Sequence, residues 1–105
     1  GAVFRDRTAK IELTWRSDHT LAASEYFEVR LRYSEDGTNN EIIIPSRVQR
    51  PTWFVDSALF GQASQRTERA YYWSVRVVRR VVGDDGAERY VPVGTLSAER
   101  TFYWR

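Results

Sequence analysis

The sequence predicts an all-β fold, an antiparallel β-sandwich of about seven short strands in a single domain of 105 residues. Three observations predict this fold class. Apolar residues recur at every second position, as in half-buried strands, while helical periodicity is nearly absent. Turn-forming residues separate the alternating segments. Aromatic residues make up 14% of the chain, so a small domain can bury a core although it has no cysteine for disulfides.

The first half of the chain contains three clear strand patterns. Ile11 to Trp15 and Tyr26 to Tyr33 alternate between apolar and polar positions. A turn cluster at residues 34–40 leads to Glu41 to Ile44, a short β-branched strand. Pro45 lacks an amide donor, so we expect it to stop this strand and to place the strand at or near a sheet edge.

The region from Pro51 to Ala70 has the weakest pattern. Trp53 to Val55 is typical of a strand. Ser57 to Phe60 fits either a continuation of that strand or a single helical turn. Gly61 to Arg69 is polar and is expected to form a loop.

The longest strand pattern lies in the second half of the chain, from Tyr71 to Val78. The next residues, 79–82, break the alternation, which indicates a bulge or the end of the strand. Gly83-Asp84-Asp85-Gly86 predicts a tight hairpin turn, because Asp-Gly supplies the positive φ angles of such turns. Glu88 to Val93 would be the returning arm, and Arg100 to Trp104 the last strand.

These segments resemble strands of the fibronectin type III family. Leu13 to Trp15, Tyr26 to Leu31 and Tyr71 to Val77 are similar to its second, third and sixth strands, and Ser97 to Phe102 to the seventh strand of bacterial members. The resemblance implies an immunoglobulin-like sandwich whose larger sheet has the strand order C′, C, F, G. Because the strand patterns extend close to both ends, we expect residues 1–105 to be one module of a longer, multidomain protein, and the likeness to bacterial members implies a bacterial one.

The family resemblance further implies that Trp15 is buried and that a tyrosine opens the sixth strand, its hydroxyl bonded to nearby backbone. Both Tyr71 and Tyr72 are open for this role, and alternation with Trp73 favours Tyr71. One departure is Gln65, where the family usually has a leucine.

Alternation and the resemblance together predict which side chains form the core. The expected core residues are Trp15, Phe27, Val29, Leu31, Tyr71, Trp73, Val75 and Phe102. We also expect Trp104 to turn inward with Phe102, and Trp53 to lie at the rim of the core.

The residues that carry catalysis or metal binding are scarce. His19 is the only histidine, and the adjacent Ser17 and Asp18 are too close in sequence to converge on it as a relay. Asp84 and Asp85 offer hard metal ligands, but a hairpin turn explains them without calcium. The glycines are scattered and form no phosphate-binding loop. We therefore expect no enzyme activity, no cofactor and no metal site.

The charge balance argues against nucleic acid as a partner. Fifteen of the sixteen basic residues are arginine, but the net charge is only +2 and acidic residues are interleaved with the basic ones. No apolar run is long enough for a transmembrane segment, so we expect no membrane insertion. Only family habit bears on location, and it suggests an extracellular or cell-envelope protein.

The candidate partner-binding patch lies on the outward face of the predicted C-F-G sheet. Antiparallel pairing would bring Arg32 and Tyr103 close to Tyr72, with Arg30 and Arg76 extending the patch toward the middle of the sheet. Exposed aromatic and arginine side chains are enriched at binding hot spots. Ordinary cross-strand pairing that shields the sheet from water is the competing interpretation.

The function predicted from these features is a non-catalytic spacer or protein-interaction module, whose partners are neighbouring domains of the parent chain or another protein. The alternative is a carbohydrate-binding accessory domain, which would stack sugars on Trp53, Phe54, Tyr90 or Trp104. A further possibility is strand addition at the uncharged edge residues 42–44, although their flanking Glu and Pro favour a protected edge.

Overall fold

Nearly all regular structure in the chain is β-strand, which confirms the all-β prediction. The computed structural model describes residues 1–105 and contains the strands β1 (Ala2–Phe4), β2 (Glu12–Thr14), β3 (Glu25–Ser34), β4 (Glu41–Val48), β5 (Thr52–Phe54), β6 (Ala70–Val82), β7 (Glu88–Pro92) and β8 (Arg100–Trp104). Two single-turn 3₁₀ helices, η1 (Ser57–Leu59) and η2 (Gln65–Thr67), lie in the connection between β5 and β6.

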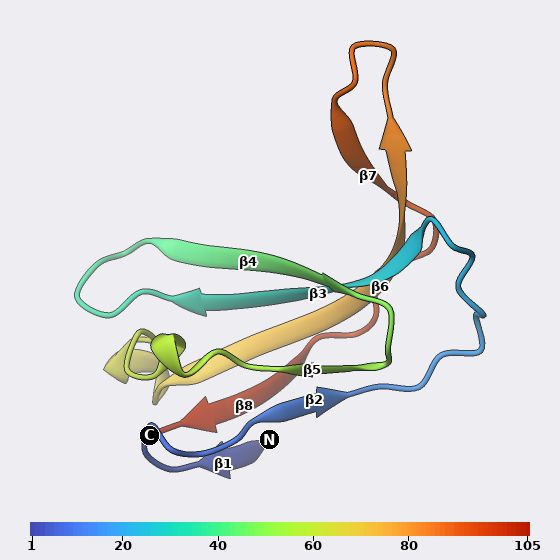
Figure 1. Cartoon of the computed structure of the whole chain (residues 1–105). Helices are drawn as coiled ribbons and strands as arrows, with labels where there is room; N and C mark the ends of the chain where they lie inside the picture. The colour runs from blue at the N-terminus through green and yellow to red at the C-terminus, as the bar shows by residue number, and fades with distance from the viewer.

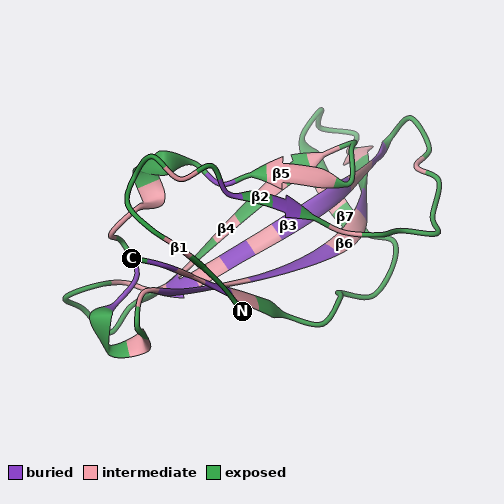
Figure 2. Ribbon diagram, turned by 90° about the horizontal axis from the view of Figure 1, so that it is seen from below, coloured by how far each residue is buried: buried purple, intermediate pink, exposed green.

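The strands form two sheets of unequal size (Figure 1). The larger sheet has the order β1-β8-β6-β3-β4, and β7 pairs with the far end of β6. Its pairs are antiparallel except β1 with β8, which are parallel, so the prediction of a wholly antiparallel fold is corrected to a mixed sheet. The smaller sheet consists of β2 and β5 only, and it covers the inner face of the larger sheet (Figure 2).

The core lies between the two sheets and is largely aromatic. Seven of the eight predicted core side chains are buried: Phe27, Val29, Leu31, Tyr71, Trp73, Val75 and Phe102. Trp104 also turns inward and is 1% exposed. The rings of Tyr71 and Phe102 stack with their centroids 5.2 Å apart, a favourable arrangement for aromatic pairs.

Trp15 is the exception among the predicted core residues, because it is only half-buried. It lies just beyond the last residue of β2, Thr14. Its ring contacts Phe27 and Trp73, with centroid separations of 5.6 Å and 6.3 Å, so one flank packs on the core. The expectation of full burial is wrong because the other flank borders a groove.

Tyr71 anchors the connection that leads into β6. Its hydroxyl donates a hydrogen bond to the Leu59 carbonyl oxygen and accepts one from the Ala63 N–H at 3.2 Å. Tyr72 points to the opposite face of the sheet, so Tyr71 is the tyrosine whose hydroxyl bonds to nearby backbone. Residues 57–59 form the helical turn rather than a continued strand, with the Asp56 side chain capping it.

Pro45 does not stop its strand, contrary to the prediction. β4 continues to Val48, and Pro45 pairs opposite Arg30 within it. The edge position itself is confirmed, since β4 is the last strand of the sheet. A proline fits inside an edge strand when its nitrogen faces the free edge, because no ladder hydrogen bond is then lost.

β6 and β7 form a hairpin that projects beyond the sandwich (Figure 1). The ladder runs without a bulge from the pair Val78–Pro92 to the pair Val82–Glu88. Alternation is blurred there because both faces of the projecting hairpin meet solvent. The turn prediction is confirmed: Gly86 has a φ of +80°.

Candidate functional site

Arg32, in the middle of the predicted patch, is bound on every side by residues of the same chain. Its Nε and Nη2 atoms donate to the two carboxylate oxygens of Glu99, at 2.6 Å and 2.7 Å. Its Nη1 atom donates to Glu41 at 2.6 Å, and its guanidinium lies 4.2 Å from the ring centroid of Tyr72. The structure thus brings Arg32 and Tyr72 together. Hydrogen bonding to Arg32 also holds the pKa of the Glu99 carboxyl below its usual value.

Arg30 and Arg76 surround a buried carboxylate instead of facing a partner. Glu28 is 3% exposed, and its oxygens lie 2.9 Å from Arg76 Nε and 3.5 Å from Arg30 Nη1. Arg47, from the edge strand, completes the set at 3.4 Å. Register explains the cluster, because Glu28 is opposite Arg47 in β4 and opposite Arg76 in β6. A carboxylate buried in this way needs its cations, so these arginines have a structural role.

Tyr103 lies on the same sheet but outside the Arg32–Tyr72 contact. In the register of β6 with β8, Thr101 is opposite Tyr72, and Tyr103 is opposite Ala70. The guanidinium of Arg105 lies 5.6 Å from the Tyr103 ring centroid. The five candidate residues therefore divide into a clamp at Arg32, a cluster at Glu28 and a separate pair at Tyr103.

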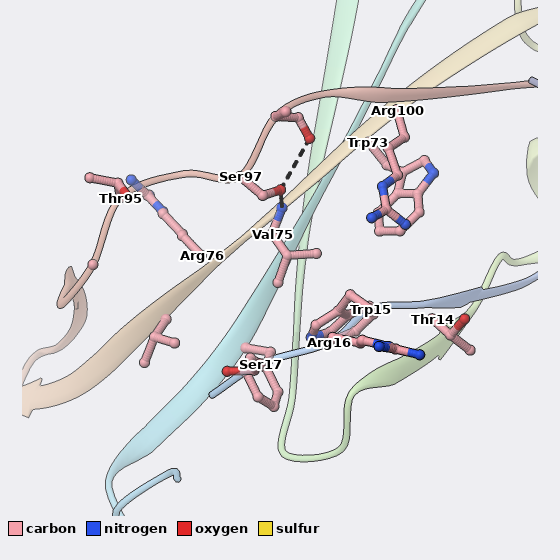
Figure 3. A pocket seen from close by; sticks show the side chains of 14 residues that line it. Thr14, Trp15, Arg16, Ser17, Trp73, Val75, Arg76, Thr95, Ser97 and Arg100 are labelled. Carbon is pink, nitrogen blue, oxygen red and sulfur yellow. Dashed lines mark hydrogen bonds between the residues drawn. The ribbon is translucent and has the colours of Figure 1, made fainter. Parts of the chain in front are cut away.

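A groove that the sequence reasoning missed opens beside Trp15 (Figure 3). It has a volume of about 550 Å³. Residues 14–17, which end and follow β2, line one side, and Thr95, Ser97 and Arg100 line the other. Trp15 also borders a second hollow of about 600 Å³, which includes Asp18 and His19.

The groove exists because the chain leaves the ladder between β7 and β8. Val93 still donates its N–H to the Val77 carbonyl at 2.9 Å, and Ser97 donates its N–H to the Val75 carbonyl at 2.8 Å. The Ser97 hydroxyl accepts the Val75 N–H at 2.9 Å, in place of a neighbouring carbonyl (Figure 3). The residues between these contacts do not pair as a strand. A break near Gly94 was the only sequence signal for this opening.

The groove combines an aromatic floor with positive charge. Phe27, Trp73 and Trp15 supply the rings, and the Nε1 atom of Trp15 is buried without any hydrogen-bond partner. Arg16 and Arg100 line the groove without an ion pair. No aspartate or glutamate is among the lining residues. The electrostatics therefore suit an anionic ligand.

The single histidine takes part in a local contact rather than a relay. His19 Nε2 lies 2.9 Å from Glu25 Oε1, while the Ser17 hydroxyl bonds only to the backbone of His19. The Ala22 N–H also donates to Glu25 Oε1 at 2.8 Å. These two bonds, the one from Ala22 first, lower the pKa of Glu25. No group of three or more His, Cys, Asp or Glu side chains is arranged to hold a metal ion.

The comparisons with known proteins give no match: the chain matches no protein-family model, no curated protein and no solved structure. Neither of the two helical turns has the length or apolar character that a bilayer crossing demands.

Proposed function

We propose that this chain is a non-catalytic protein-interaction module with a fibronectin type III-like fold, belonging to a larger bacterial protein. The order β4-β3-β6-β8 supports the fold assignment, because it follows the C′, C, F, G order of that family. The hydrogen-bonded Tyr71 supports it too, since it resembles the tyrosine that opens the sixth strand.

The groove beside Trp15 is the observation that carries the binding role. Its aromatic floor offers apolar area, and its unpaired arginines offer charge that the protein itself does not neutralise. The outer face of the larger sheet has the same residue types, but their polar atoms are already bonded to one another. Partners would be neighbouring domains of the parent chain or another protein.

Carbohydrate binding is the second candidate, and one observation favours it. Phe54 in β5 is 58% exposed, beside the partly buried Trp53. The other proposed stacking residues are less suitable. Trp104 is buried, and the guanidinium of Arg47 covers the Tyr90 ring at 3.8 Å from its centroid.

Peptide selection tests the proposed function directly. Random peptides displayed on phage are selected on the wild-type protein and then retested on Thr95→Trp, which places a large ring in the groove. We expect binding to be lost in that variant and kept in Ala87→Trp, a control at the exposed hairpin tip.

Two results would contradict the groove as the site of interaction. Selected peptides that bind Thr95→Trp as well as the wild type would place the interaction elsewhere. A glycan-array signal that disappears in Phe54→Ala, with no selected peptides, would support the carbohydrate-binding alternative. Silence in both experiments would leave the spacer role.

A further inference from the structure

We propose that the groove binds an extended, acidic peptide segment as an added strand along the free edge of β2, with one large apolar side chain packed on the groove-lining rings of Trp15 and Trp73. This inference rests on the proposed function of an interaction module and names the class of partner. It follows from the strand edge, the charge and the aromatic rings that meet at one site.

The edge of β2 that faces the groove has no partner strand. β2 pairs with β5 alone, while β1, the other strand of the N-terminal region, pairs with β8. The Trp15 N–H bonds the Pro51 carbonyl at 3.2 Å, so Trp15 faces the β5 side. Backbone groups alternate in direction along a strand, so those of Thr14, the last residue of β2, point to the free edge. Unpaired edges of this kind accept an extended peptide.

The groove lies along this free edge rather than under β5. Residues 14–17 line it, and no residue of β5 does. The opposite wall is the irregular segment before β8, which contributes Gly94, Thr95, Ser97 and Ala98. An added strand would thus lie between β2 and this segment, where the sandwich has no strand of its own.

The charge of the groove selects an acidic segment. Arg16, Arg76 and Arg100 line it, and only Arg76 has a carboxylate partner, Glu28. With no acidic lining residue, the field in the groove attracts carboxylates and repels lysine-rich segments.

The aromatic floor selects one large apolar side chain. The rings of Trp15 and Trp73 are tilted at 56° to each other, and Arg100 lies 5.4 Å from the Trp73 ring centroid. The Trp15 Nε1 atom itself is buried, so an apolar side chain in the groove would contact the ring of Trp15 and not this N–H.

A titration followed by NMR tests this inference. ¹⁵N-labelled protein is titrated at low salt with the capped peptides Glu-Glu-Phe-Glu-Glu and Lys-Lys-Phe-Lys-Lys. With the acidic peptide, we expect the Trp15 indole N–H signal to shift in a saturable way, because a peptide side chain would pack on this ring. The Trp104 indole signal is the internal control, because it already donates to the Asp6 carbonyl at 2.7 Å and should not move. The basic peptide should leave both signals in place.

Charge-reversal variants locate the binding. Arg16→Glu should weaken the acidic peptide about tenfold or more, equivalent to about 1.4 kcal/mol. Arg89→Glu makes the same change of net charge on the exposed hairpin. The affinity of this variant for the acidic peptide should stay within about twofold of the wild-type value.

N-methylated peptides test the strand addition separately. Methyl groups at residues 2 and 4 block one edge of the peptide, and methyl groups at residues 1, 3 and 5 block the other. Strand pairing predicts that one of these peptides loses binding while the other keeps it. Equal binding of both would overturn the added strand.

Three other results would overturn the inference as a whole. These are an unmoved Trp15 indole, equal affinity for the acidic and basic peptides, or equal weakening by Arg16→Glu and Arg89→Glu. The proposed function would survive any of them if phage-selected peptides still bound the wild type and not Thr95→Trp. If the phage-selected peptides also failed to bind the wild type, both the inference and the proposed function would be overturned.

Discussion

The outer face of the larger sheet and the groove beside Trp15 use the same residue types for different ends. On the outer face, Arg32 is held by two glutamates and a tyrosine ring, and the arginines around Glu28 neutralise a buried carboxylate. In the groove, Arg16 and Arg100 have no carboxylate partner. Composition alone therefore does not distinguish an arginine that holds the fold from one that is free to bind. Register does.

The largest expected effect is a difference in stability loss between two tryptophan variants, one in the core and one beside the groove. Trp73→Ala should lower the free energy of unfolding by about 3–5 kcal/mol, because it empties a buried site. Trp15→Ala should cost less, about 1–3 kcal/mol, since one flank of this ring already faces the groove. Urea unfolding followed by circular dichroism measures both. An equal loss at the two positions would mean that Trp15 belongs to the core.

The next effect concerns the buried carboxylate of the outer face. Glu28→Ala should lower the free energy of unfolding by about 2 kcal/mol, because Arg30, Arg47 and Arg76 then repel one another without a counter-charge. The arginines are partly exposed, so the loss stays below that of a fully buried pair. Glu28→Gln keeps the shape and should lose about as much. Stability unchanged in both variants would show that the cluster is not structural.

A smaller effect is expected at the clamp around Arg32. A double-mutant cycle of Arg32→Ala and Glu99→Ala should give a coupling energy of about 0.5–1 kcal/mol. The value is modest because both side chains are more than one-third exposed, and it should fall when salt is raised. A coupling near zero at low salt would show that the clamp contributes nothing to stability.

The smallest effect is the contribution of Glu99, on the outer face, to the pH dependence of stability. The pKa of Glu99 is lowered in the folded protein, chiefly by its hydrogen bonds to Arg32. Its stabilisation is therefore complete above the ordinary glutamate pKa and is lost as pH falls through the lowered value. In urea unfolding between pH 7 and pH 3, Glu99→Gln should make the decline of stability with acid shallower. Arg16→Ala should leave the decline unchanged, since no carboxylate lines the groove.

Local alternation was enough to predict the elements that cross the sandwich. It identified β3, the first part of β6, and β8, together with the inward side of each, because a half-buried strand has a period of two whatever its partners. Two local predictions failed. Pro45 does not stop its strand, and residues 79–82 form neither a bulge nor a strand end. Whether proline fits depends on the strand being at an edge, and alternation has no meaning in a hairpin that meets solvent on both faces.

The candidate site was predictable only where neighbours follow from simple pairing. Arg32 and Tyr72 are cross-strand partners, so their contact could be anticipated. Arg47 was missed, because the strand that carries it was expected to end before it. The groove could not be predicted at all: it depends on residues 93–99 leaving the ladder opposite the end of β2, and no local pattern relates those two segments.

The central claim, that arginines paired with a carboxylate hold the fold and unpaired groove arginines do not, is tested most directly at Arg76 and Arg16. Both line the groove, but only Arg76 reaches Glu28. The measurement is the free energy of unfolding of Arg76→Ala and Arg16→Ala in urea. We predict a loss of about 1–2 kcal/mol for Arg76→Ala and less than about 0.5 kcal/mol for Arg16→Ala. Equal losses, or a larger loss at Arg16, would contradict the claim.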